Sequence, residues 1–329
     1  MQTASGNHLL LRGLYGQAVP NVVESITRPV KLRRSMPVLE AAGSLQRATE
    51  HGLGPSGLSR GCVRHSRDMG ILEGKVAIVT GAGRGIGRAI ALEYAAEGAR
   101  VVVASRTAST VDEVVAAIRG GGGEVIGITC DVGVAADIRS MVDETVATFG
   151  GVDVLVNNAQ SFGTRDAPRS STPTTNLEDV DEDEWDWTFE TGVKATLRAM
   201  QAVFPHMRAA GGGRILNFGS RRGIMCNPDS ASYNCNKEAI RALTRTGANA
   251  WGKHGITVNV LNPVILTDSA EGVFADHPDA RQATEAQIPL RRWGLPRDCA
   301  RVAVFLAGPD ASYLTGMTFM VEGGLTSLP

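Results

Sequence analysis

The sequence contains few residues that could cross-link the chain or bind a metal. Its five cysteines form no C-x-x-C pair and are widely scattered, at Cys62, Cys130, Cys226, Cys235 and Cys299. The six histidines form no cluster with metal-ligand spacing. We therefore expect reduced thiols, a cytoplasmic location and no bound metal.

Long apolar runs and an excess of one charge are also absent. No stretch approaches the roughly 18 to 20 uninterrupted apolar residues of a membrane-spanning helix, so we expect no membrane association. Lys and Arg number 33 against 34 Asp and Glu, which gives a formal net charge of -1. This balance provides no general attraction to nucleic acid or to an anionic surface. A small neutral or mildly charged molecule is the partner that fits best.

The first 68 residues differ from the rest of the chain. They show no sustained periodicity, are rich in Gly, Ser and Arg, and carry more basic than acidic residues. One interpretation is a disordered low-complexity extension, which loosely resembles an organellar transit peptide. The other, which we favour, is a start codon assigned too far upstream, because MGILEGKVAIVTGAG from Met69 already forms a complete beginning of a domain. A functional tail stays the alternative.

From Lys75 onward, short β-branched runs alternate with longer amphipathic stretches, which is typical of repeated βα units. The 329-residue chain, 43% hydrophobic, is long enough to bury a substantial core. We predict one α/β domain over 69–329, with a Rossmann-type doubly wound parallel seven-stranded sheet in a three-layer αβα sandwich. Strands are expected at Val76–Thr80, Arg100–Ala104, Val125–Thr129, Val152–Val156, Arg214–Phe218, Ile256–Leu261 and Met317–Val321. Helices are expected at positions including Ile86–Glu97, Val134–Phe149, Glu184–Met207, Ala231–Lys253 and Arg297–Leu306.

A glycine-rich turn, Thr80 to Gly87, follows the first expected strand and leads directly into a helix. Gly81 permits a tight turn, Gly85 lets the backbone approach a pyrophosphate, and Gly87 lets the helix pack close to the strand. The N-terminus of that helix offers unpaired N–H groups to phosphate oxygens. The context therefore predicts a dinucleotide site.

Tyr233 and Lys237 stand four residues apart on an expected helix, so both project from one face. A free tyrosine has a pKa of about 10, and a neighbouring ammonium would lower that pKa toward neutral pH. Tyr233 could then give a proton to a carbonyl oxygen or take one from an alcohol. Ser220 follows the fifth strand and could orient the same oxygen.

The T-G-x-x-x-G-x-G spacing, together with Asn157-Asn158-Ala159, the set Ser220, Tyr233 and Lys237, and Asn262-Pro263, resembles the short-chain dehydrogenase/reductase family from Gly70 to Gly324. The resemblance implies a NADP(H)- or NAD(H)-dependent oxidoreductase that interconverts a ketone or aldehyde and an alcohol, with Tyr233 as acid/base. Lys237 would also hold the ribose hydroxyls of the nicotinamide half. It further implies a homo-oligomer, tetramer or dimer, assembled through the two long helices.

The residues expected to bind the cofactor come from several strand ends. The second strand ends in Ala104-Ser105-Arg106, without the acidic residue that would accept a ribose 2′-hydroxyl. Arg106 and Arg84 could instead hold a 2′-phosphate, so NADP(H) is favoured over NAD(H); the alternative is that both are solvated surface charges. The full expected set is Gly81, Arg84, Gly85, Ile86, Gly87, Ser105, Arg106, Asp131, Val132, Asn158, Ala159, Tyr233, Lys237, Pro263, Ile265 and Thr267.

Three positions depart from the family pattern. Gln160 replaces the glycine of N-N-A-G, where it could contact the substrate or cap the strand. Gly192 aligns with the family's fourth catalytic residue, an Asn that helps seat a water, and could keep the local irregularity of the helix. Val264 follows Pro263 where the family has glycine, and valine resists positive φ. These departures keep open a non-catalytic cofactor-binding sensor or scaffold.

The segments expected to form the substrate cleft are 160–184 and 268–289, because ligands of such sheets bind beyond the carboxyl ends of the strands. The second contains Phe274, His277 and Ile288 and is a candidate lid. Neither segment identifies a substrate beyond a small-molecule carbonyl compound or alcohol.

Overall fold

The structure is a computed structural model, and it describes residues 70–169, 174–267, 271 and 278–326. The expected N-terminal extension, 1–68, lies outside the described residues, as do Met69, Phe274 and His277. The fold described below belongs to the compact unit Arg64–Pro329.

Seven parallel strands form one sheet with the order β3-β2-β1-β4-β7-β8-β9. Because β1 pairs with both β2 and β4, the chain winds outward from β1 in two directions. This order confirms the expected doubly wound sheet. The strands are β1 (Val76–Thr80), β2 (Arg100–Ser105), β3 (Val125–Thr129), β4 (Val154–Asn157), β7 (Gly213–Phe218), β8 (Ile256–Pro263) and β9 (Thr318–Val321).

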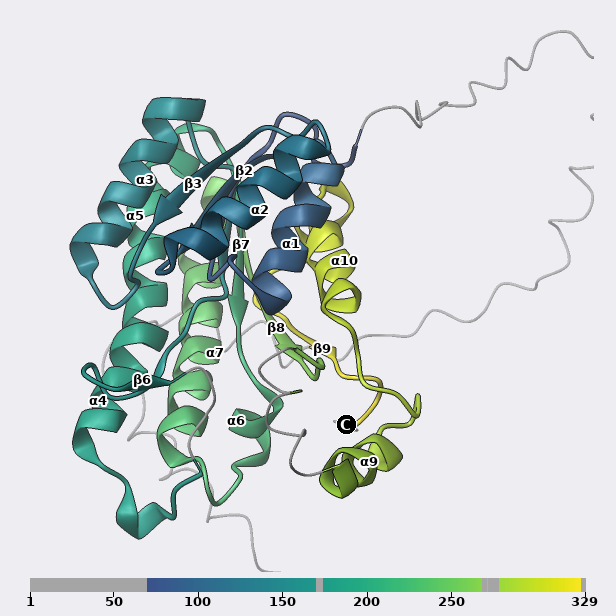
Figure 1. The fold of residues 1–329 in the computed structure, drawn as a ribbon. Helices are drawn as coiled ribbons and strands as arrows, with labels where there is room; N and C mark the ends of the chain where they lie inside the picture. Colours follow the sequence, from purple (N-terminus) through teal and green to yellow (C-terminus); the bar gives the residue numbers. More distant parts are fainter. Residues whose placement is uncertain (1–69, 170–173, 268–270, 272–277, 327–329) are drawn as a thin grey trace, which may run out of the picture. The chain divides into compact units, whose positions relative to one another are not determined.

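Helices cover both faces of the sheet (Figure 1). Alternate strand residues point to opposite faces, as the two-residue period of a strand requires. Val79 packs with α1 and α10, whereas its neighbour Ile78 packs in the core that α3, α5 and α7 cover. The three-layer sandwich is thereby confirmed. One layer holds α1 (Gly85–Ala96), α2 (Ala108–Gly120) and α10 (Pro296–Ala307), and the other holds α3 (Ala135–Phe149), α5 (Ala195–Ala209) and α7 (Ala231–Trp251).

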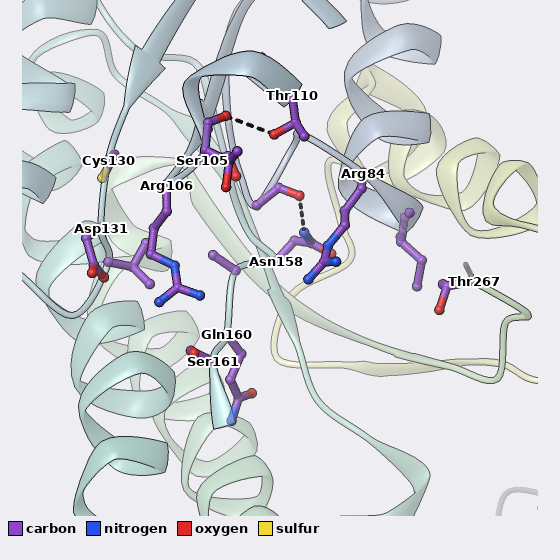
Figure 2. A pocket seen from close by; sticks show the side chains of 16 residues that line it. Arg84, Ser105, Arg106, Thr110, Cys130, Asp131, Asn158, Gln160, Ser161 and Thr267 are labelled. Carbon is purple, nitrogen blue, oxygen red and sulfur yellow. Dashed lines mark hydrogen bonds between the residues drawn. The ribbon is translucent and has the colours of Figure 1, made fainter. Parts of the chain in front are cut away.

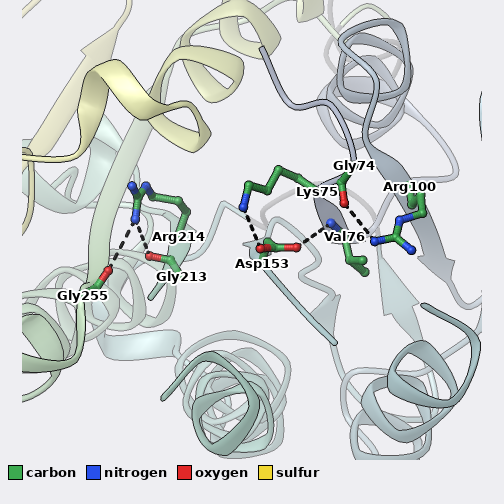
Figure 3. A network of polar contacts seen from close by, with 8 residues as sticks. All are labelled: Gly74, Lys75, Val76, Arg100, Asp153, Gly213, Arg214 and Gly255. Carbon is green, nitrogen blue, oxygen red and sulfur yellow. Dashed lines mark hydrogen bonds and ion pairs between the residues drawn. The ribbon is translucent and has the colours of Figure 1, made fainter. Parts of the chain in front are cut away.

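Polar contacts close the amino-terminal edge of the sheet (Figure 3). Asp153 accepts hydrogen bonds from Lys75 Nζ at 3.0 Å and from Val76 N at 2.9 Å, so it joins the starts of β1 and β4. Arg100 donates to the carbonyl of Gly74 at 2.9 Å. These contacts satisfy backbone groups at the amino-terminal edge. Ligands of doubly wound sheets bind at the opposite, carboxyl edge.

The long helix expected over Glu184–Met207 is interrupted. It consists of α4 (Glu182–Phe189), a π-helical turn (Glu190–Lys194) and α5. Helix α4 begins two residues early because Asp181 caps it, accepting a hydrogen bond from Glu184 N at 3.0 Å. The π turn centres on Gly192, so the expected irregularity at that glycine is present.

Several short elements complete the described fold. Ile288 is buried and lies against Gly323, so this part of the candidate lid belongs to the core. The remaining elements are β5 (Phe162–Gly163), β6 (Pro168–Arg169), α6 (Arg221–Met225), α9 (Pro278–Gln287) and 3-10 turns at Leu177–Asp179, Gly252–His254 and Pro309–Ala311.

Candidate active site

A cavity of about 350 Å³ opens at the carboxyl ends of β1, β2, β3 and β4 (Figure 2). It includes the point between β1 and β4 where the strand order reverses, which is where doubly wound sheets bind ligands. The lining residues are Gly81, Arg84, Gly85, Ile86, Ser105, Arg106, Thr107, Thr110, Cys130, Asp131, Val132, Asn158, Ala159, Gln160, Ser161 and Thr267.

The glycine-rich turn leaves no room for side chains at two of its positions. Gly81 has φ +65°, and a Cβ there would lie 2.8 Å from Asn158 Nδ2. Gly87 lies inside α1, where a Cβ would approach the Gly81 carbonyl oxygen to 2.3 Å and Asn158 Nδ2 to 2.6 Å. These glycines bring the N-terminus of α1 against the end of β1, with its N–H groups directed toward the cavity edge.

Hydrogen bonds hold the ends of β1 and β4 together. Thr80 Oγ1 donates to Val156 O at 3.1 Å and accepts from the backbone N–H groups of Asn158 and Ala159, each at 3.1 Å. Asn158 Nδ2 donates to the carbonyls of Thr80 at 2.9 Å and Gly81 at 3.2 Å. The cavity floor is therefore fixed in position by paired groups from both strands.

Two arginines stand at the rim next to β2. Arg84 and Arg106 are exposed, and neither forms an ion pair with any residue that the structure describes. Within the described part of the lining, Asp131 is the one acidic side chain, and its Oδ1 accepts from Gly133 N at 2.8 Å. The β2 end of the cavity is thus electropositive and offers the hydroxyls of Ser105 and Thr110.

The structure brings most of the expected cofactor residues to this cavity: Gly81, Arg84, Gly85, Ile86, Ser105, Arg106, Asp131, Val132, Asn158, Ala159 and Thr267. Thr267 reaches the glycine turn, because a Cβ on Gly85 would lie 3.6 Å from its methyl carbon. Pro263 and Ile265 do not line the cavity, and Ile265 is buried in the core. Val264 continues the sheet, donating to Val321 O at 2.9 Å, and its φ is not positive.

Ser220, Tyr233 and Lys237 come together beside this cavity, although they are not part of its lining. Ser220 caps α6, where its Oγ accepts from Arg222 N at 3.2 Å, and it is hydrogen-bonded to the Tyr233 phenol. Lys237 Nζ donates to Phe218 O at 2.8 Å and lies 5.6 Å from the centroid of the Tyr233 ring. The end of β7 and one face of α7 therefore supply an acid, a base and a hydroxyl in one place.

Burial dominates the protonation of this group. It lowers the pKa of Lys237 to about 7. Burial also raises the pKa of Tyr233, while the hydrogen bond with Ser220 and the charge of Arg222 act to lower it. Tyr233 thus remains a neutral proton donor, and Lys237 can exchange a proton near neutral pH.

Three residues of this region were not predicted from the sequence. Phe162 packs edge-on against Tyr233, with ring centroids 5.4 Å apart. Arg222 supplies a positive charge that opposes the larger effect of burial on the pKa of Tyr233, and Asn236 fills the space next to Gly192. Arg222 follows Ser220 by two residues and Asn236 precedes Lys237, so proximity to the motif was a usable signal for both. Nothing in the sequence pointed to Phe162.

Two features are not found in the described part of the chain. No three His, Cys, Asp or Glu side chains gather there as they would around a metal ion. No helix there combines the length and apolar character needed to cross a membrane.

Known proteins resemble this chain over most of its length. A family model described as enoyl-(acyl carrier protein) reductase matches residues 81–326. Dehydrogenase/reductase SDR family member 4 of Bos taurus is 38% identical over 78% of this chain and 88% of its own. A 3-oxoacyl-(acyl-carrier-protein) reductase of Staphylococcus epidermidis is 37% identical over 76% and 98%. A 7 alpha-hydroxysteroid dehydrogenase solved with NADH and 7-oxo glycochenodeoxycholic acid superposes with a TM-score of 0.71 at 34% identity, covering 77% of this chain and 94% of that one.

The lowered pKa of Lys237 predicts a specific pH dependence of stability. The unfolded chain, with a lysine pKa of about 10.4, binds more protons than the folded protein between pH 7 and that value, so the free energy of unfolding rises with pH there. From pH 7 to 9, cofactor-free wild type should gain on the order of 1–2 kcal/mol relative to Lys237→Met, measured by urea unfolding. The exposed Lys253→Met is the control. Equal pH slopes in wild type and Lys237→Met would contradict the prediction.

Proposed function

The chain belongs to the short-chain dehydrogenase/reductase family, and from that membership we propose that it interconverts a carbonyl compound and an alcohol with NADP(H), using Tyr233 as acid/base. It is an NAD(P)-dependent oxidoreductase. The observation that carries the finer proposal is the assembly of Ser220, Tyr233 and Lys237 beside a cavity at the switch point of the sheet. Relatives named as reductases and dehydrogenases do not favour the alternative of a non-catalytic sensor or scaffold.

The cavity fits a nicotinamide dinucleotide, which when bound supplies or accepts the hydride. The turn from Gly81 to Gly87 and the N-terminus of α1 would hold the pyrophosphate: Gly85 lines the cavity without a side chain, and Gly87 lets α1 pack against the end of β1. Asp131 and Val132 would contact the adenine, Asn158, Ala159 and Thr267 the nicotinamide half, and Lys237 the ribose hydroxyls. Arg84 and Arg106 would hold a 2′-phosphate, because both are exposed at the rim without an ion-pair partner among the described residues.

In the proposed reaction, each residue of the reaction centre holds, transfers or stabilises a proton or a charge. Tyr233, kept protonated by burial, gives a proton to the substrate oxygen in reduction and takes one in oxidation. Ser220, bound to the same phenol, orients that oxygen and stabilises charge that develops on it. Arg222 favours the phenolate that forms once Tyr233 has given up its proton. Lys237 then restores the proton, which its pKa of about 7 permits.

The substrate class is a small-molecule ketone, aldehyde or alcohol. The Staphylococcus relative is named as a 3-oxoacyl-(acyl-carrier-protein) reductase, and the solved structure contains 7-oxo glycochenodeoxycholic acid. A 3-oxoacyl thioester and a 7-oxo steroid are therefore reasonable test compounds. Gln160 supports a polar contact with the substrate or cofactor, because its side-chain amide is buried with no partner among the described residues. We further propose a cytoplasmic homo-oligomer, tetramer or dimer, assembled through α4, α5 and α7.

Removing the phenol tests the proposed function. We expect Tyr233→Phe to lose about 10²- to 10⁴-fold in kcat, because the group that transfers the proton is gone. Turnover of NADPH or NADH is followed with a 3-oxoacyl thioester, a 7-oxo steroid, simple ketones and an enoyl thioester. Tyr313→Phe, whose side chain is fully exposed, is the matched control and should keep wild-type rates. Turnover that survives Tyr233→Phe would rule out the assigned acid/base.

The rim arginines predict the choice of cofactor. Arg84→Ala and Arg106→Ala should each weaken NADPH binding about 10- to 100-fold, the value of a charge-assisted hydrogen bond, and leave NADH binding unchanged. Fluorescence titration of both cofactors measures the two dissociation constants. Arg139→Ala, an exposed arginine on α3, is the control. Equal losses for NADPH and NADH, or none, would show that these arginines do not read the 2′-phosphate.

A further inference from the structure

The space beside Gly192 is filled by a side chain from another helix. A Cβ built on Gly192 would lie 2.3 Å from Asn236 Nδ2, 2.4 Å from its Oδ1 and 2.6 Å from its Cγ. The whole carboxamide of Asn236 therefore occupies the volume into which a residue-192 side chain would project. Gly192 is the position where the sequence departs from the family's Asn, and Asn236 is fully buried.

The carboxamide also supports the π turn. Asn236 Oδ1 accepts a hydrogen bond from Val193 N at 2.8 Å, so a backbone donor of the widened turn is satisfied by α7. On its other side, Thr191 Oγ1 donates to Ser161 O at 2.9 Å and accepts from Ser161 N at 3.3 Å. The π turn is thus clamped between the helix that carries Lys237 and the loop that lines the cofactor cavity.

One donor of this carboxamide remains without a protein partner. Asn236 Nδ2 is buried, and no described residue accepts a hydrogen bond from it. A buried amide N–H that bonds to nothing is costly, and buried water commonly satisfies such groups. Gln160 and Ser161, on the loop that Thr191 holds, also present buried polar atoms without partners in the described chain. A bound water needs several polar partners, and unpartnered polar atoms of this kind would supply them.

We propose that Asn236 is a positioning residue for the reaction centre: its carboxamide takes the space left by Gly192, holds the π turn through Val193, and seats a buried water at its Nδ2. Through these contacts α7, which carries Tyr233 and Lys237, is fixed against the π turn and the loop at Ser161. Asn236 itself touches neither substrate nor cofactor. The inference rests on the proposed function for its catalytic part and on packing alone for the water seat.

Exchanging the two residues tests the proposal by activity. Asn236→Ser should lower kcat about 10- to 100-fold, the penalty for a displaced catalytic group, while the NADPH dissociation constant and KM stay near wild type. Gly192→Asn alone should lower both kcat and stability, because two carboxamides would compete for one space. The double variant Gly192→Asn/Asn236→Ser should recover most of kcat, since one carboxamide again fills the site.

A matched control separates this role from packing. Asn234→Ser removes another buried asparagine of α7, which donates to Asn227 O at 2.7 Å, and should lower stability without the selective loss of kcat. Wild-type kcat in a folded Asn236→Ser protein would overturn the proposal. A double variant no more active than the weaker single variant would do so as well.

A crystal structure of the wild-type protein with NADP, at a resolution that shows ordered water, tests the seat without any variant or substrate. We expect a water within hydrogen-bond distance of Asn236 Nδ2; direct packing of that atom against apolar groups would overturn the proposal. If the proposed function fails, the wild type will show no Tyr233-dependent turnover, yet the water seat can still be observed. The two failures are therefore distinguishable.

Discussion

The joining of β1 and β4 at their carboxyl ends is the constraint on which the rest of the site depends. Asn158 donates hydrogen bonds to Thr80 and Gly81 across the point where the strand order reverses, and Gly81 and Gly87 let α1 approach that point closely. The parallel order of the strands places the ends of β2 and β3 on the same edge. The ends of these strands are therefore fixed relative to one another, so the polar groups that line the cavity are organised before any ligand binds.

Desolvation is the second organising effect, and it acts on the other side of the cavity. Burial raises the pKa of Tyr233 and lowers that of Lys237 to about 7, which moves the two values apart. A protonated Lys237 is then a stronger acid than the Tyr233 phenol, so proton transfer from it to the phenolate is favourable. The structure therefore obtains acid/base function mainly from burial, with Arg222 and Ser220 favouring the ionised phenol.

The sequence predicted the fold well because its signals were local and repeated. Alternating strand residues, the glycine spacing and the Tyr233–Lys237 pair each follow from short-range geometry, and the sheet order and three layers agreed with them. What could not be predicted depends on contacts between distant segments. The carboxamide of Asn236 reaches the space beside Gly192 across 43 intervening positions. Phe162 contacts Tyr233 from the short strand β5, which no sequence pattern predicted. Ile265 was expected at the cofactor, but its side chain is buried in the core and lies against Gly294, a residue 29 positions further along the chain.

The central claim is that a dinucleotide binds where α1 approaches the end of β1, and one substitution tests it most directly. Alanine normally favours a helix over glycine, but at position 87 its Cβ would collide with the Gly81 carbonyl and Asn158. Titration of NADPH fluorescence should show that Gly87→Ala raises the dissociation constant at least about tenfold, or roughly 1.4 kcal/mol. Gly120→Ala, at the end of α2 with open space around it, should bind NADPH like the wild type. Unchanged NADPH binding by a folded Gly87→Ala protein would contradict the account.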